Sequence, residues 1–112
     1  MKTALPPGET LIREGGASLQ RGVEVVGGRL FLTNQRLLFE PHAINFQRDA
    51  VETPLSDIEA LVPLWTKLFG LLPIVPNVVG LKTFSGADLE FLVFSRKAWL
   101  EAIAGQMEQH VA

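Results

Sequence analysis

The sequence contains no cysteine and no tyrosine, and its only histidines are His42 and His110. Without cysteine there can be no disulfide bond, thiolate metal site or thiol nucleophile. Histidine and tyrosine supply much of the acid–base chemistry that enzymes use near neutral pH, so their scarcity argues against catalysis. The two histidines also lack the spacing of metal ligands. We therefore predict no enzyme, no catalytic residue, no cofactor and no metal site.

The sequence also lacks a basic excess and a long apolar run. Ten Lys and Arg residues face twelve Asp and Glu residues, and this net charge of −2 argues against nucleic-acid binding. The longest uncharged stretch, residues 68–81, holds 14 residues with two prolines, whereas a membrane-spanning helix needs about 20 apolar residues. No signal-peptide pattern opens the chain. We expect a cytoplasmic protein with one domain, residues 9–112, after a flexible N-terminus, residues 1–8.

Most of the chain predicts short strands. The apolar and β-branched runs cover residues 11–19, 23–26, 30–33, 36–39, 50–55, 58–62, 78–84 and 89–94. They amount to about seven strands without intervening helices, so the pairing should be antiparallel. We interpret Gly15-Gly16 as a bulge, Gly27-Gly28 as a bend, and Asn34-Gln35 as a tight hairpin turn in which asparagine tolerates a positive φ.

The C-terminal region changes to a helical period. Trp99, Ile103, Met107 and Val111 recur every four residues and form one apolar stripe, with Ser95 placed as a candidate N-cap. A lone helix of this length is marginally stable in water, so it should dock on the strands. The pattern predicts a mainly β fold with one helix, a small barrel plugged at one end by that helix.

Several segments resemble the GRAM domain family, of the small stand-alone bacterial type. The similarity lies in residues 28–42 (GRLFLTNQRLLFEPH), 54–58 (PLSDI), 91–93 (FLV) and 96–99 (RKAW). The resemblance implies a pleckstrin-homology-like barrel of two near-orthogonal antiparallel sheets, about seven strands in all, capped by a C-terminal α-helix. It also implies a non-catalytic binding module. GRAM domains in larger proteins are associated with membranes, phosphoinositides or protein partners.

Apolar residues in unusual places indicate a partner-binding surface. Residues 64–75 read as a loop with many large apolar side chains, which either folds over the barrel end, binds a protein or dips into a membrane. If Leu30, Leu32, Leu37, Phe39, Phe91 and Val93 face inward, alternation sends Phe31, Leu38, Leu92 and Phe94 outward, where a solvated face should be polar. We expect binding to another protein or self-association as a homodimer. The candidate residues are Trp65, Lys67, Leu68, Phe69, Leu71, Leu72, Phe31 and Phe94.

Four arginines provide the alternative, a peripheral membrane module that binds phosphoinositide-type lipid. Arg13, Arg21, Arg29 and Arg36 lie on or beside the first predicted strands, and guanidinium groups pair bidentately with phosphate oxygens. Glutamates are interleaved with them, however, as on an ordinary solvated face. Arg36 fits a structural pairing role better than ligand binding. We therefore expect anionic lipid to bind weakly or not at all.

Overall fold

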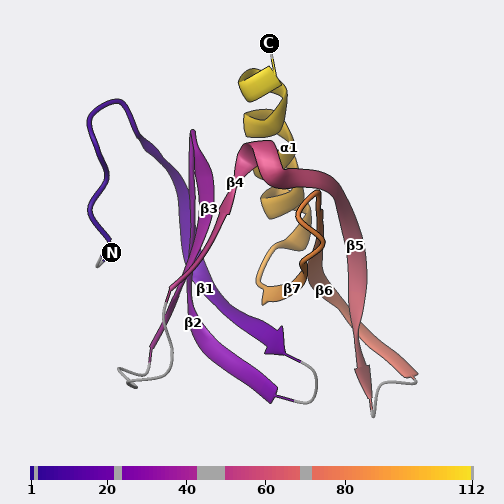
Figure 1. Cartoon of the computed structure of the whole chain (residues 1–112). Helices are drawn as coiled ribbons and strands as arrows, with labels where there is room; N and C mark the ends of the chain where they lie inside the picture. Colours follow the sequence, from indigo (N-terminus) through magenta and orange to yellow (C-terminus); the bar gives the residue numbers. More distant parts are fainter. Residues whose placement is uncertain (2, 22–23, 43–49, 69–71, 112) are drawn as a thin grey trace.

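The computed structural model describes residues 1, 3–21, 24–42, 50–68 and 72–111, and the side chains of these residues except 21, 65–68, 72–76 and 111 (Figure 1). The strands are β1 (Leu11–Arg21), β2 (Glu24–Thr33), β3 (Arg36–Pro41), β4 (Val51–Pro54), β5 (Ile58–Leu68), β6 (Leu72–Thr83) and β7 (Asp88–Val93). A short 3-10 helix, η1 (Leu55–Asp57), precedes β5, and the chain ends in α1 (Arg96–Val111). The expected mainly β fold with a C-terminal helix is confirmed.

The seven strands form one antiparallel sheet in the order β4-β3-β2-β1-β7-β6-β5. Strand β1 pairs with β2 over its whole length and with β7 over Ala17–Gln20, so it belongs to both halves of the sheet. The expected separation into two sheets is therefore not seen among the described strands. Residues Ala17–Gln20 of β1 pair with β2 on one edge and with β7 on the other. The sheet is therefore continuous and bends at this strand.

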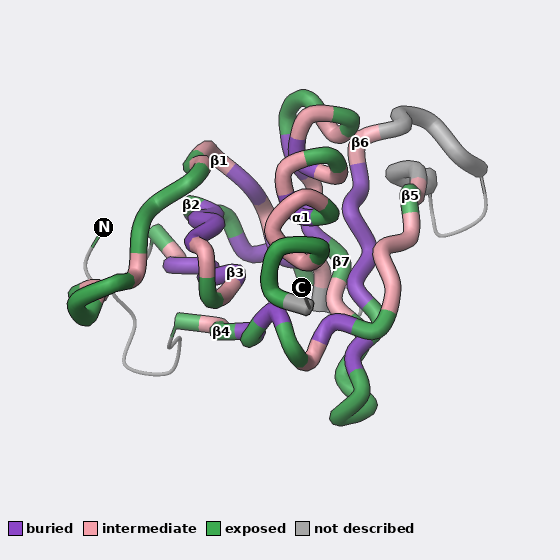
Figure 2. Tube along the Cα trace, turned by 90° about the horizontal axis from the view of Figure 1, so that it is seen from above, coloured by how far each residue is buried: buried purple, intermediate pink, exposed green. Residues whose placement is uncertain are grey.

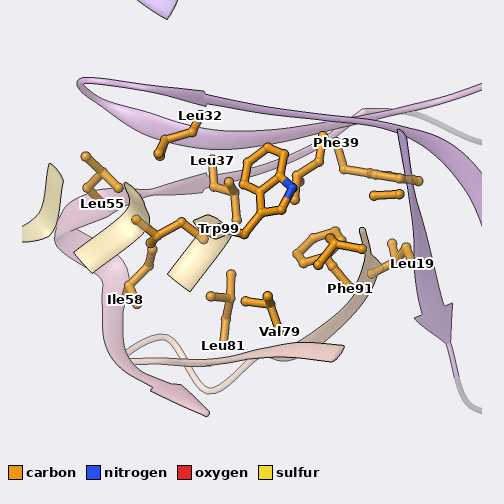
Figure 3. Packing of buried hydrophobic residues seen from close by; sticks show 14 of the residues in the cluster. Leu19, Leu32, Leu37, Phe39, Leu55, Ile58, Val79, Leu81, Phe91 and Trp99 are labelled. Atoms are coloured by element: carbon orange, nitrogen blue, oxygen red, sulfur yellow. The ribbon is translucent and has the colours of Figure 1, made fainter. Parts of the chain in front are cut away.

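The helix α1 lies between the two halves of the bent sheet (Figures 1 and 2). Trp99 and Ile103 are fully buried, as the helical stripe predicts. In Figure 3 the Trp99 ring sits between side chains of the two sheet halves, with Leu37 on one half and Val79 and Leu81 on the other. The six strand residues expected to face inward all belong to this core: Leu30, Leu32, Leu37, Phe39, Phe91 and Val93.

One glycine of each pair, Gly15 in β1 and Gly28 in β2, marks close packing. Strand β2 continues through Gly27-Gly28, where the sequence predicts a bend. Position 28 requires glycine because a Cβ atom there would lie 2.3 Å from the Glu40 carbonyl oxygen. The register shift in β1 falls between Leu11 and Arg13 and not at Gly15-Gly16. A Cβ at Gly15 would lie 3.4 Å from the Trp99 ring, so this glycine leaves room for the core tryptophan.

Residues 64–75, which the sequence suggests to be a loop, extend the β5–β6 hairpin. The two strands pair from Ile58↔Thr83 to Leu68↔Leu72. Only Val78–Lys82 of β6 pair with β7, so the part of the hairpin beyond Val78 is a two-stranded ribbon. The candidate residues Phe69 and Leu71 lie outside the described residues, as do the side chains of Trp65, Lys67, Leu68 and Leu72. Gly70, Pro73 and Pro76 interrupt the apolar runs of the sequence here, so the strand pattern is hidden.

The turn between β2 and β3 has the expected position but a different chemistry. Among the described residues other than glycine, Ser95 alone has a positive φ (59°), so Asn34 does not use the left-handed conformation. Instead, the hydroxyl of Thr33 accepts hydrogen bonds from the backbone N–H groups of Gln35 and Arg36, each at 3.0 Å. Ser95 immediately precedes α1, and its carbonyl accepts the Trp99 N–H at 3.1 Å, which places it in the expected N-cap position.

Candidate functional site

Two of the residues expected on an exposed outer face are buried. Phe31 and Leu38 do sit opposite each other on the face away from the core, but each is only 1% exposed. Figure 1 shows the N-terminal segment on the outer side of β1–β3, away from α1. This segment therefore explains their burial. The expectation that Phe31 is an exposed partner-binding residue is wrong, because alternation shows which way a side chain points but not what covers it.

The N-terminal segment is tied to β2 and β3 by side chains. The Asn34 amide donates to the Gly8 carbonyl at 3.0 Å, and its Oδ1 accepts the Thr10 N–H at 2.8 Å. Further along, the Thr3 N–H donates to the Glu40 carboxylate at 2.8 Å. Residues 3–8, expected to be flexible, thus make specific contacts with the folded domain. Asn34 works here as an anchor for the segment.

A nearly buried ion pair completes this attachment. Arg36 donates to both carboxylate oxygens of Glu9, through Nε at 2.8 Å and Nη2 at 3.1 Å, and the Thr33 hydroxyl donates to the same carboxylate at 2.6 Å. Glu52 pairs with Arg36 from the opposite side at 3.0 Å. Burial alone would raise the pKa of Glu9, but the hydrogen bonds and the Arg36 charge outweigh it, so the pKa lies below its ordinary value. Arg36 has the structural pairing role that the sequence favours.

We expect Glu9→Gln to destabilise the domain by about 2 kcal/mol at pH 7, because Arg36 would lose its better-buried partner and keep only Glu52. A lowered folded-state pKa adds stability above the ordinary carboxyl value of about 4.3, and this contribution is lost as the pH falls through the folded-state value. Urea titrations should therefore show that the difference in the free energy of unfolding between wild type and Glu9→Gln becomes smaller below about pH 4.

Glu14→Gln is the matched control for this experiment. Its carboxylate is 47% exposed and lies 3.5 Å from the equally exposed Arg29, so its removal should change stability little at any pH. An equal loss of stability in Glu9→Gln and Glu14→Gln would contradict the stabilising role of the Glu9–Arg36 pair. So would a stability difference between wild type and Glu9→Gln that does not change with pH.

The four arginines of the lipid alternative do not form one site. Arg13 lies on the inner side, with its guanidinium carbon 5.0 Å from the Trp99 ring centroid, as a cation–π contact. Its Nε is buried without a hydrogen bond. Arg29 lies exposed beside Glu14, and Arg36 is held by Glu9 and Glu52. The Arg21 side chain lies outside the described residues.

The outer face carries an open hollow of about 370 Å³ over β1, β2 and β7. Its lining includes Gly16, Ser18, Gly27, His42, Leu92 and Phe94, together with Asn77 of the neighbouring β6. Ser18 pairs with both Gly27 and Leu92, so these three residues form a row across the strands. At the rim, Phe94 is 83% exposed, as alternation predicts, while Leu92 is half-buried. Strand alternation places Leu92 and Phe94 on this face, but it gives no sign of the hollow beside them.

Two glycines, Gly16 and Gly27, keep the hollow open, although neither the backbone conformation nor a close neighbour requires glycine at these positions. A Cβ at Gly16 would meet no atom within 4 Å, and one at Gly27 would make only an ordinary 3.7 Å contact with His42. Neither residue has a positive φ. Glycine in a strand interior costs stability and often marks a place where another molecule approaches closely. Mid-strand glycines at diagonal positions of the paired strands β1 and β2 are the sequence signal that could have located this site.

The family model of the GRAM domain matches residues 1–97. The chain belongs to the GRAM domain family. Two solved structures share the fold of this GRAM domain. The C-terminal domain of an unknown protein from Leishmania infantum has a TM-score of 0.72 at 20% identity, over 89% of this chain and 85% of its own. The Vps36 N-terminal PH domain has a TM-score of 0.71 at 19% identity, over 96% and 86% respectively.

These comparisons confirm the pleckstrin-homology-like fold, and GRAM and pleckstrin-homology-like domains are generally binding modules. No curated protein sequence matches the chain. In the part of this GRAM domain that the structure describes, no three acidic or histidine side chains are placed to hold a metal ion. None of the described helices is long and apolar enough to cross a bilayer.

Proposed function

We propose that this GRAM domain is a non-catalytic module that binds a protein through the outer face of β1, β2 and β7. We call this surface the outer patch and define it as the hollow together with Val25, Leu92 and Phe94. The observation that carries the proposal is Phe94, a phenylalanine 83% exposed at the rim of a hollow that it helps to line.

The outer patch has the composition of a protein-binding surface. Val25 is 51% exposed and lies on the same face of β2 as Gly27, so it adds apolar area beside the hollow. No ionisable group other than His42 lines the hollow. Interface centres are depleted in charge, and their binding energy concentrates in aromatic anchors that fill pockets. A hollow beside an exposed aromatic ring suits such an anchor.

Lipid binding is the second candidate, and the β5–β6 ribbon is the observation that favours it. Its residues 65–68 and 72–77 include Trp65 and Lys67, residue types that are common at membrane surfaces. A two-stranded ribbon beyond the sheet suits shallow insertion into a bilayer. The arginines, which would have supplied phosphate contacts, are dispersed, so we rank this function second.

The test is selection of random peptides displayed on phage against the immobilised domain. We expect peptides with an aromatic or aliphatic anchor, whose binding is lost in Gly16→Val and Phe94→Ser. Phe84→Ser is the control, because Phe84 is another exposed phenylalanine (68%) but lies at the β6–β7 turn. Peptides that bind all three variants equally would overturn the outer patch as the binding surface.

Sedimentation with vesicles of phosphatidylserine and phosphatidylcholine separates the second candidate. We expect most of the domain to stay in the supernatant at physiological salt. Strong sedimentation that persists in Phe94→Ser and is lost in Trp65→Ser would favour lipid binding through the ribbon over the proposed function.

A further inference from the structure

The geometry of the outer patch points to a second copy of this chain as its partner. We propose a two-fold dimer in which Phe94 of each copy enters the hollow of the other. This inference rests on the proposed function, since it uses the same surface and names the occupant.

Projection and hollow lie side by side on one face, which is the arrangement a two-fold dimer requires. Phe94 follows β7 directly, and Gly16 and Ser18, on the adjacent β1, form the floor of the hollow next to it. In a two-fold interface the same patch serves both copies, so a residue that projects from one copy must find its hollow on the same patch of the other. A surface with both elements adjacent can satisfy this with one rotation.

The charges around the hollow also suit self-association. A patch with charges of one sign only would be repelled by the same patch of the second copy across a two-fold axis. Here the hollow is lined without carboxylates or basic side chains apart from His42. At its border, Arg29 pairs in register with Gly16 and lies 3.5 Å from Glu14, so both signs occur together. Each copy therefore offers a cation and an anion to the other at the rim.

The size of the patch predicts a weak, reversible dimer. Three strands at about 4.8 Å spacing, each contributing about six residues at 3.4 Å, present roughly 300 Å² of flat sheet. Rim side chains such as Phe94 and Val25 add to this, but the total stays well below the roughly 800 Å² per partner of a standard interface. Monomer and dimer should therefore exchange as the concentration changes.

Sedimentation velocity across a wide concentration range tests the dimer. Wild type should shift from monomer to dimer as concentration rises. Phe94→Ala removes the projecting ring, and Gly16→Val fills the hollow at a site where the added Cβ meets no atom within 4 Å. Both variants should stay monomeric at concentrations where wild type is mostly dimer, while Phe84→Ala should behave as wild type. Circular dichroism melts of the two variants show whether each remains folded, and Gly16→Val should melt no lower than wild type.

Mixing the two variants provides the sharper test. Phe94→Ala keeps an open hollow and Gly16→Val keeps a projecting ring, so one of the two contacts can form in a mixed dimer. With one variant labelled, the mixture should associate more strongly than either variant alone and less strongly than wild type. Absence of any mixed dimer, with wild type dimerising, would overturn reciprocal insertion.

The inference and the proposed function can fail separately. A wild type that stays monomeric at every concentration, yet binds selected peptides through the outer patch, overturns the second copy as occupant and leaves the protein-binding function standing. A monomeric wild type with no patch-dependent peptide overturns both. Dimerisation that survives both Phe94→Ala and Gly16→Val places the interface elsewhere and overturns the inference.

Discussion

Replacing Trp99 with alanine is expected to lower the free energy of unfolding by about 3 to 5 kcal/mol. The indole is the largest fully buried side chain, it lies between the two sheet halves in Figure 3, and it carries the Arg13 contact. Its removal would leave a cavity between the two halves of the bent sheet. The two halves cannot move together to fill it, because they are joined through the pairing of β1 with β7. For a domain whose total stability is about 5 to 15 kcal/mol, this loss is severe.

Urea denaturation followed by circular dichroism measures this change, and Phe84→Ala is the matched control. Phe84 is also aromatic but is 68% exposed, so its removal should change stability by less than about 0.5 kcal/mol. If the Trp99→Ala variant unfolds at nearly the same urea concentration as wild type, α1 does not hold the two sheet halves together through this residue.

Gly28→Ala is expected to be the other severe substitution, although it adds only one methyl group. The new Cβ would lie 2.3 Å from the Glu40 carbonyl oxygen and 2.7 Å from the Phe39 ring. Backbone cannot yield as a flexible side chain does, so β2 and β3 would have to separate where they pair. We expect a loss of about 3 kcal/mol or more, or an insoluble protein.

The neighbouring glycine provides the control for this prediction. Gly27→Ala adds the same methyl group one residue earlier in β2, where its nearest neighbour is the His42 ring at 3.7 Å. Thermal melts should therefore place Gly27→Ala within a few degrees of wild type and Gly28→Ala far below. Similar melting temperatures for the two variants would show that the close approach at Gly28 is relieved at little cost.

The strands and the helix could be predicted from the sequence because their patterns are local. The four-residue repeat from Trp99 onward identifies α1 and its buried face, and the alternation in residues 30–33 and 36–39 identifies the inward side chains correctly. That β2 runs without a break through Gly27-Gly28 could not be predicted in the same way. Gly27-Gly28 looks like a break unless one knows that Phe39 and the backbone of β3 occupy the space beside it.

The candidate site was only partly accessible to sequence reasoning for a similar reason. Alternation correctly places Phe94 on an exposed outer face, yet the same rule gives Phe31 the same environment. The difference arises from residues 3–10, which reach the face of Phe31 and are held there by Asn34 and Arg36. Coverage by a distant segment and a hollow between two strands are both tertiary features, and neither leaves a periodic signal.

The pairing of β1 with β7 has a consequence for synthesis of the protein. Ala17, near the start of the chain, pairs with Val93, and α1 fills the core only after that. The strands β1–β4 can form their meander early, but their apolar inner face, including Leu30, Leu37 and Phe39, has no cover until the last third of the chain emerges from the ribosome. Folding of this domain is therefore completed only once α1 has been synthesised, and the growing chain is most vulnerable to aggregation and proteolysis just before α1 appears.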